Sequence, residues 1–394
     1  MLSTLKGRFS STRAYNAYAI GASGRDCGKT EVWLMYSQCL SRKTIGTMTC
    51  CVRLQACMIA ITVLSMVGVP GVGGQEGVRS FSMGVAYWPP LGVWTPDDVV
   101  RDDLGKLLPS TDAILVQVPW CPGSDLSEAA WMSSIAIESG KQLILAIDWL
   151  AGGRREVRCS EANPWTFAAE ETTVGFRDAI IRLAERFRPH YMLLGVEVDH
   201  YAVIAPTDFP HFLAAYQIAR AEVGGVSPET RVGVSLQYEH MMRTPGERDL
   251  FVNEMVTTFE GMSDFVGLST YPFMGGVDDP GLDATYFAAV EDLAIPLAIM
   301  ETGWPAANVV GSQYGYGSQA PYLASLLRAL DALEVSMVVW ASVRDVDLGH
   351  VDDGTPPWAA FIGLWDSGGN PKPALAVWLS WLTRQPAVGN FSPL

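Results

Sequence analysis

The sequence predicts an α/β protein, a single (β/α)8 barrel that follows an N-terminal leader. From Phe81 onward, eight short runs rich in Val, Ile and Leu alternate with longer amphipathic stretches. The runs are apolar throughout, which is typical of parallel strands that are covered on both faces. Eight strand–helix units in about 300 residues match the size of a closed barrel.

The predicted strands are Ser82–Tyr87, Ala113–Val118, Gln142–Asp148, Tyr191–Val198, Arg231–Gln237, Asp264–Thr270, Pro296–Glu301 and Ser336–Ala341. Helical patterns are found at Thr173–Phe187, Pro210–Val223, Gly246–Phe259 and Gln319–Leu333, and Pro373–Leu382 is expected to be a closing helix. Thr95-Pro96-Asp97-Asp98 places a proline and two acids where a first helical turn favours them.

A doubly wound open sheet is the alternative fold. Its first strand usually leads into a glycine-rich turn. Tyr87-Trp88-Pro89-Pro90 occupies that position here, so the barrel is favoured. We expect no second domain after residue 80.

The chain reads as two unlike pieces, a leader over 1–75 and a barrel over 76–394. Its 394 residues are 49% hydrophobic, which excludes a disordered protein. The formal net charge of -15 divides into +6 for the leader and -21 for the remainder. An acidic body repels phosphate backbones, so we expect no nucleic-acid partner.

The leader contains an uncharged apolar segment, 56–72, preceded by Arg53, Lys43 and Arg42. A basic flank, a short apolar run and small residues after it predict a secretory signal. A membrane anchor is the alternative, and only an uncleaved segment would bring the protein to a membrane. Because some fifty residues precede the segment, we expect Met48 or Met58 to be the true start. The protein is therefore predicted to be secreted or extracytoplasmic.

Polar and aromatic side chains gather where the predicted strands end. In a barrel of this kind, the chemistry lies at the carboxyl ends of the strands. An acidic, aromatic-rimmed mouth suits a neutral carbohydrate, although any single ring could instead be core. The candidate substrate-binding residues are Trp88, Gln117, Asp148, Trp149, Asp199, Gln237, Tyr271, Trp304 and Trp340.

Two glutamates stand out as candidate catalytic residues. Glu197 ends the fourth predicted strand and Glu301 ends the seventh. Burying a charge at the end of an apolar run costs free energy, unless the charge is paired or has a role in catalysis or binding. The alternative interpretation is an internal ion pair with Arg344 or Arg231.

The placement of glutamates at the ends of strands four and seven resembles that in the retaining glycoside hydrolases of clan A. Asp264–Phe273 and Glu301-Thr-Gly-Trp-Pro305 are similar to segments of the endo-β-1,4-galactanase family, and the second is equally similar to plant-type β-1,3-glucanases. Gly363–Asp366 and the Gly369-Asn-Pro-Lys-Pro373 stretch resemble the closing segment of many clan members.

The resemblance implies a role for each matching residue. Glu197 would be the general acid/base and Glu301 the nucleophile. Tyr271 would donate a hydrogen bond to the nucleophile, and Trp340 would form a sugar platform. Clan members usually have Asn before the acid/base, where this chain has Val196, so the contact with the sugar 2-hydroxyl is in question. Asp199, Gln237 or Gln117 are candidates to replace it.

Cofactor and metal signals are weak. The five histidines show no ligand spacing, so we expect no zinc. The predicted function implies no organic cofactor. Asp345, Asp347, Asp352 and Asp353 could hold calcium, but a solvated loop is favoured. Cys121 and Cys159 follow neighbouring strand ends, and a disulfide between them is an open alternative in an exported protein.

The sequence thus predicts a monomeric retaining glycoside hydrolase. Its expected substrate is a neutral poly- or oligosaccharide of the β-galactan or β-glucan type. Two alternatives remain open: a catalytically silent carbohydrate-binding protein on the same barrel, and a transglycosylase that uses the same pair of glutamates.

Overall fold

The computed structural model describes residues 77–87, 97–151, 153–160, 165–242, 248–277, 279–283, 285–307, 318–346 and 357–387. The predicted leader, Trp88, and Asp347, Asp352 and Asp353 lie outside these ranges. Within them, no helix is long and apolar enough to span a bilayer.

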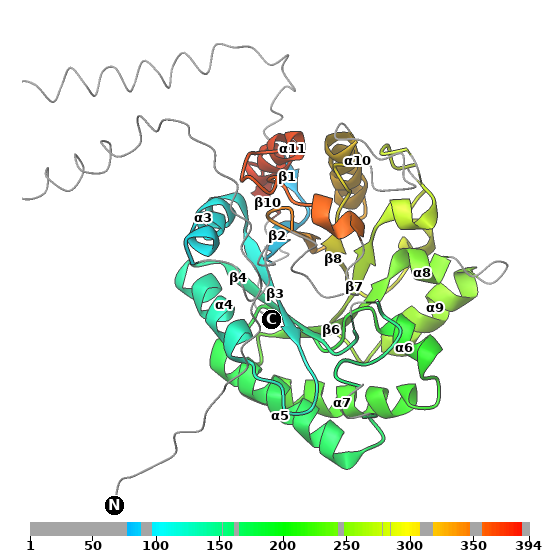
Figure 1. Cartoon of the computed structure of the whole chain (residues 1–394). Coiled ribbons are helices and arrows are strands. Elements are labelled where there is room, and N and C mark those ends of the chain that lie inside the picture. Colours follow the sequence, from blue (N-terminus) through cyan, green and yellow to red (C-terminus); the bar gives the residue numbers. More distant parts are fainter. Residues whose placement is uncertain are drawn as a thin grey trace, which may run out of the picture. The chain divides into compact units, whose positions relative to one another are not determined.

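Eight parallel strands close into a barrel in the order of the chain, as the sequence predicts (Figure 1). The strands are β2 (Ser82–Ala86), β3 (Ala113–Pro119), β4 (Gln142–Asp148), β5 (Tyr191–Leu193), β6 (Arg231–Gln237), β7 (Phe265–Thr270), β8 (Leu297–Thr302) and β9 (Met337–Trp340). The ring closes where β2 pairs with β9, with Ser82 opposite Met337. The protein is therefore a (β/α)8 barrel.

Helices surround the strands on the outside of the barrel (Figure 1). The longer ones are α3 (Asp97–Leu107), α4 (Ser127–Glu138), α5 (Glu170–Phe187), α7 (Phe209–Val226), α9 (Arg248–Phe259), α10 (Gln319–Ala332) and α11 (Pro373–Leu382). Short helical segments are α6 (Val198–Ile204), α8 (Tyr238–Met242), η2 (Leu108–Ser110), η3 (Pro272–Gly275), η4 (Ala288–Val290) and η5 (Pro357–Phe361).

The core has two layers because successive side chains of a strand point to opposite faces. The inward layer fills the barrel and includes Ile144, Tyr191 and Phe265. The outward layer packs against the helices and includes Ile114, Leu143 and most of the buried aromatic residues. Strands buried on both faces explain the continuous apolar runs in the sequence.

The fourth barrel strand is shorter than predicted, because β5 ends at Leu193 and not at Val198. At Gly195 the chain turns so tightly that a Cβ atom there would lie 2.4 Å from Val198 Cγ1. Glu197 then adopts a left-handed conformation with φ of 53°. Apolar composition continues through this turn, so the sequence pattern did not reveal the strand end.

Two buried ion pairs lie near the end of the barrel, and one of them connects it to α3. Arg344 contacts the buried Asp103 of α3, with Nε 2.7 Å from Oδ1, and is not a partner of Glu197. Lys372 contacts Asp345 at 2.5 Å, and both side chains are buried. The expectation that Asp345 lies in a solvated loop is therefore wrong. β1 (Val78–Arg79) and β10 (Gln385–Pro386) form a separate two-residue parallel pair that was too short to predict.

Candidate active site

A β-bulge in β8 turns Glu301 toward the barrel mouth. Leu268 of β7 pairs with Ile299, but the next residue, Ser269, pairs with Glu301. Met300 is the extra residue, and it points into the barrel. If side chains alternated strictly along β8, Glu301 would point outward to the helices, because Met300 points inward. The bulge changes the alternation so that Glu301 also points inward. Thr302, the next residue, points outward again.

Glu197 is presented from the turn between β5 and α6. Its backbone N–H donates to the Ser235 hydroxyl of β6 at 3.0 Å. The left-handed conformation at Glu197 is strained for a residue with a side chain. Tertiary contacts therefore hold this carboxylate at the mouth in a conformation that the local sequence does not favour.

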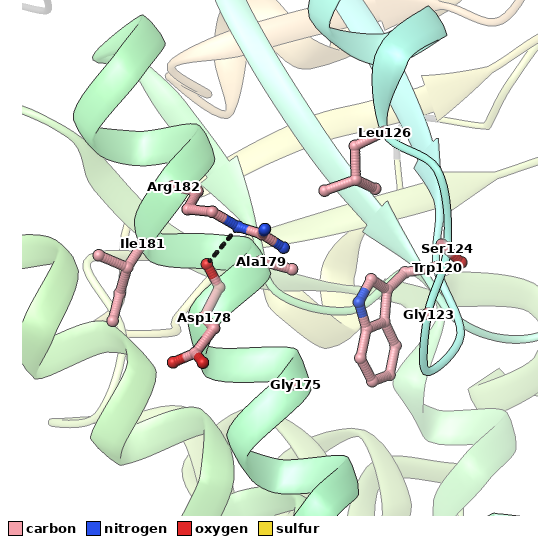
Figure 2. A pocket seen from close by; sticks show the side chains of 9 residues that line it. All are labelled: Trp120, Gly123, Ser124, Leu126, Gly175, Asp178, Ala179, Ile181 and Arg182. Carbon is pink, nitrogen blue, oxygen red and sulfur yellow. Dashed lines mark hydrogen bonds between the residues drawn. The ribbon is translucent and has the colours of Figure 1, made fainter. Parts of the chain in front are cut away.

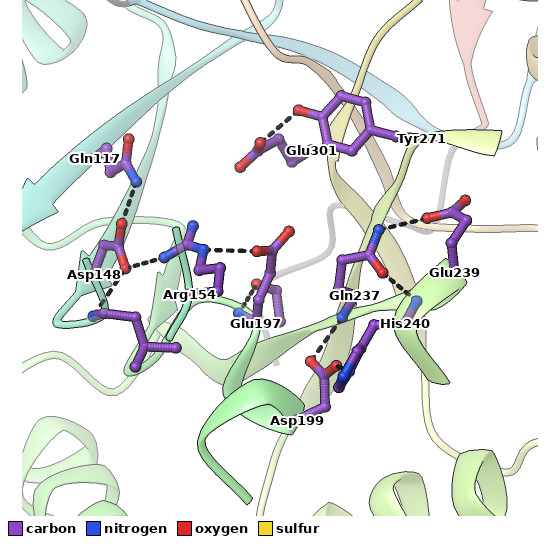
Figure 3. A network of polar contacts seen from close by, with 12 residues as sticks. Gln117, Asp148, Arg154, Glu197, Asp199, Gln237, Glu239, His240, Tyr271 and Glu301 are labelled. Atoms are coloured by element: carbon purple, nitrogen blue, oxygen red, sulfur yellow. Dashed lines mark hydrogen bonds and ion pairs between the residues drawn. The ribbon is translucent and has the colours of Figure 1, made fainter. Parts of the chain in front are cut away.

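Figure 3 shows Glu197 and Glu301 facing the same space at the mouth. Burial, with the negative charge of Glu197 close by, raises the pKa of Glu301 from 4.5 to about 7. The Tyr271 hydroxyl donates to Glu301 Oε1 at 2.5 Å. Glu301 therefore keeps a proton at a higher pH than an exposed glutamate does.

Arg154 is a member of the site that the sequence did not indicate. Its Nε lies 2.7 Å from Glu197 Oε2, and its Nη1 lies 2.6 Å from Asp148 Oδ1 (Figure 3). Burial opposes the charge of Arg154, but nearby carboxylates outweigh it and raise the pKa of the guanidinium. Glu197 therefore does form an ion pair, with a residue other than the Arg344 or Arg231 considered from the sequence.

Asp148 anchors one side of the site. Gln117 Nε2 donates to its Oδ2 at 2.6 Å, and Arg158 Nη2 lies 3.0 Å from the same oxygen. The carboxylate is 1% exposed. Gln117 and Asp148 are thus gathered beside the glutamates, as expected, but Asp148 is engaged with protein partners.

A second group of buried polar residues lies on the other side of Glu197. Asp199 Oδ1 accepts the Gln237 backbone N–H at 2.8 Å, and Gln237 Nε2 donates to Glu239 at 2.7 Å. Thr270 and Tyr286 also donate to Glu239. Burial raises the pKa of Glu239, which these hydrogen bonds partly offset. Asp199 and Gln237 are engaged here and are less available to a ligand than expected.

Three predicted sugar-binding rings belong to the core, which corrects the expectation from the sequence. Trp149, Trp304 and Trp340 are each at most 1% exposed. Each indole N–H is also used, donating to Leu194 O, Ser318 Oγ and Ile362 O respectively. On β9, Met337 and Val339 point inward, so Trp340 points outward to the helix layer. These rings are not placed to stack on a ligand.

Val196 also points into the barrel. It is 4% exposed and packs with the inward layer. The residue in the place of the expected Asn is therefore a core residue here.

Asp199, His200 and His240 form a cluster whose potential ligand atoms all lie within 4.8 Å of one another. The spacing in the sequence gave no sign of this. The two imidazole rings are stacked, with centroids 3.9 Å apart and planes 16° apart. Ring-nitrogen lone pairs lie in the ring planes, so stacked rings do not aim at a common ion. His240 Nδ1 is instead 2.6 Å from Asp199 Oδ2.

Cys121 and Cys159 form a disulfide, which resolves the open alternative from the sequence. It joins the loop after β3 to the segment 153–160, which carries Arg154 and Arg158. An antiparallel bridge pairs Val157 of this segment with Leu150, just after β4. The disulfide and the bridge together restrain the segment that reaches into the site.

We expect loss of this disulfide to destabilise the barrel. The cysteines are 38 residues apart, and closing a loop of that length corresponds to about 3–4 kcal/mol in the chain-entropy model. A Cys121→Ser/Cys159→Ser variant should unfold at lower urea concentration than the oxidised wild type. The reduced wild type is the control and should match the variant. Equal midpoints for all three would contradict the prediction.

The cavity in Figure 2 lies apart from the glutamates. It has a volume of about 370 Å³ and lies between the loop after β3, which includes Trp120 and Ser124, and helix α5, which includes Asp178 and Arg182. None of its lining residues is among those labelled in Figure 3. A second cavity, of about 460 Å³, borders the disulfide and Arg158.

Comparison with known proteins identifies relatives by fold alone. No family model matches the sequence, and no curated protein matches it. An exo-β-1,4-mannosidase from an Opitutaceae bacterium is 16% identical, with a TM-score of 0.57 over 78% of this chain and 60% of that one. This chain thus spans less than two thirds of the mannosidase.

Other solved structures are also similar in fold at low sequence identity. A family 5 glycoside hydrolase variant from Bifidobacterium longum, in complex with Manβ1-4GlcNAc, is 16% identical, with a TM-score of 0.59 over 78% of this chain and 80% of that one. The family 53 catalytic domain from Ignisphaera aggregans is 15% identical, with a TM-score of 0.54 over 80% and 98%. Family 53 is the galactanase family of the sequence resemblance, and its match is no stronger than the others. The chain thus has the (β/α)8 fold that these glycoside hydrolases share.

Proposed function

We propose that the protein is a retaining glycoside hydrolase. The observation that carries this proposal is the pair Glu197 and Glu301 at the mouth of the barrel, with the Tyr271 hydroxyl on Glu301 (Figure 3). Glu197 follows barrel strand four and Glu301 lies on strand seven. The solved structures named above, which share the fold, are glycoside hydrolases. Carbohydrate is therefore the proposed substrate.

In the proposed reaction, a Glu301 oxygen attacks the anomeric carbon as the bond to the leaving oxygen breaks. Glu197 gives its proton to that oxygen, and the sugar is left bound to Glu301 as an ester. Glu197 then removes a proton from water, whose oxygen attacks the anomeric carbon and releases Glu301. The two inversions retain the configuration of the sugar.

Finer features belong to the same proposal. A neutral β-linked glycan of the galactan or glucan type suits the acidic body. The Cys121–Cys159 disulfide supports an oxidising compartment, and with the basic leader it favours export. Tyr271 orients Glu301, and burial beside Glu301 raises the pKa of the Tyr271 phenol, which keeps it a hydrogen-bond donor.

The proposal is tested by screening the full chain against aryl glycosides and plant and microbial polysaccharides. A Glu197→Gln/Glu301→Gln double variant run in parallel measures the background. With any substrate found, a 2-fluoro glycoside should add one sugar to the protein at Glu301, read by mass spectrometry of the peptides. A glycan that binds but is not turned over would replace hydrolysis with a binding function, and longer products would indicate transglycosylation.

We expect kcat/KM to fall as the pH rises above about 7. The reactive pair carries one proton, and the raised pKa of Glu301, about 7, marks the loss of that proton from the pair. Above it both glutamates are ionised, and no acid remains to protonate the leaving oxygen. A pH profile of kcat/KM on an unactivated substrate checks this. A constant rate up to pH 9 would contradict it.

A further inference from the structure

The strongest unexplained feature of the site is the position of Arg154 between two buried carboxylates. A retaining enzyme needs Glu197 protonated and Glu301 ionised when the substrate is attacked. The contacts at Arg154 oppose that arrangement. Its guanidinium lies 2.7 Å from Glu197 and 2.6 Å from Asp148, and a cation at this distance favours the charged form of a carboxyl group.

Glu301 experiences the opposite surroundings. Burial and the charge of Glu197 raise the pKa of Glu301 to about 7, and Tyr271 is its direct hydrogen-bond partner. In the free protein the single proton of the pair is thus expected on Glu301. Hydrolysis requires that O–H bond to break and an O–H bond to form on Glu197.

The backbone provides independent support. Arg154 and Glu197 have φ angles of 56° and 53°, and Cys159 on the same segment has 61°. These are three of the five non-glycine residues with positive φ among the described residues. Strained conformations persist where surrounding structure enforces them, often at functional sites. Here the disulfide at Cys159 and the pairing of Arg158 with Asp148 restrain the segment on the C-terminal side of Arg154.

We propose that Arg154 is a positioning residue that holds Glu197 as a carboxylate in the free protein, and that substrate must break the Arg154–Glu197 contact before Glu197 can act as an acid. Arg154 keeps Asp148 as its partner when the contact breaks, so its charge stays paired. The inference rests on the proposed function, since it concerns the same pair of glutamates.

The deciding experiment needs no substrate. Full-length protein labelled with ¹³C at the glutamate carboxyl carbons is observed by NMR at pH 6, and the signals are assigned with Glu197→Gln and Glu301→Gln. In the wild type, Glu197 should give the shift of a carboxylate and Glu301 that of a carboxylic acid. In Arg154→Gln the two assignments should exchange.

Arg158→Gln is the matched control. It removes a guanidinium that contacts Asp148 but not Glu197, so its Glu197 signal should remain that of a carboxylate. Arg154→Lys covers the case in which Arg154→Gln does not fold, and there Glu197 should stay ionised. A protonated Glu197 in the wild type, or unchanged signals in a folded Arg154→Gln protein, would overturn the proposal.

Kinetics give a second reading once a substrate is known. If substrate must displace Arg154, Arg154→Gln should lower KM by roughly tenfold, because no contact is broken on binding. Arg158→Gln should not lower it. An inert wild type with the predicted carboxyl shifts would support the effect of Arg154 on Glu197 but reject hydrolysis. An active wild type with a protonated Glu197 would support hydrolysis but reject the role of Arg154.

Discussion

Glu301→Gln should lower kcat/KM by at least about 10⁴-fold, because no nucleophile would remain to form the covalent intermediate. The amide keeps the size of the side chain and can still accept from Tyr271, so the site should keep its shape. Rates on an aryl glycoside, measured against the background of the double variant, check this. An activity loss below tenfold would remove Glu301 from the mechanism.

The stability of the same variant is its control for folding. The pKa of Glu301 rises from 4.5 to about 7 in the folded protein, so the folded state keeps a proton that the unfolded chain releases in this window. The wild type therefore loses stability as the pH rises from 4.5 to 7. Glutamine does not titrate, and Glu301→Gln should be more stable than the wild type by about 3 kcal/mol at pH 8. At pH 4 the difference should be small.

Glu197→Ala should lower kcat/KM by about 10²–10⁴-fold on substrates with poor leaving groups. With an activated aryl glycoside, formation of the intermediate needs no acid, but water still needs a base to complete the second step. Azide needs none, so it should restore turnover and yield a glycosyl azide of retained configuration. Product analysis by NMR checks the configuration.

Glu301→Ala provides the contrast for this experiment. Azide would then take the place of the missing nucleophile directly, and any product would have inverted configuration. Rescue of Glu301→Ala with inversion and of Glu197→Ala with retention would establish both roles. The opposite pattern would exchange them.

The sequence by itself determined the barrel and the two glutamates. Strands buried on both faces must be apolar throughout, and β4 and β6 have the bounds predicted from that rule. A carboxylate at the end of such a run is conspicuous for the same reason. Glu197 and Glu301 could therefore be identified from the sequence, although they are 104 positions apart in the chain.

The tertiary structure alone decided which side chains share the mouth. Trp340 and Trp304 lie near predicted strand ends in the sequence. Which residues point inward, however, depends on the alternation along each strand and on the bulge at Met300. Amino-acid composition does not reveal this register. Arg154 follows no motif, and its place depends on a strained backbone conformation and on a segment restrained by the Cys121–Cys159 disulfide. Contacts between distant residues fix both features, which is why they emerge only when the chain is folded.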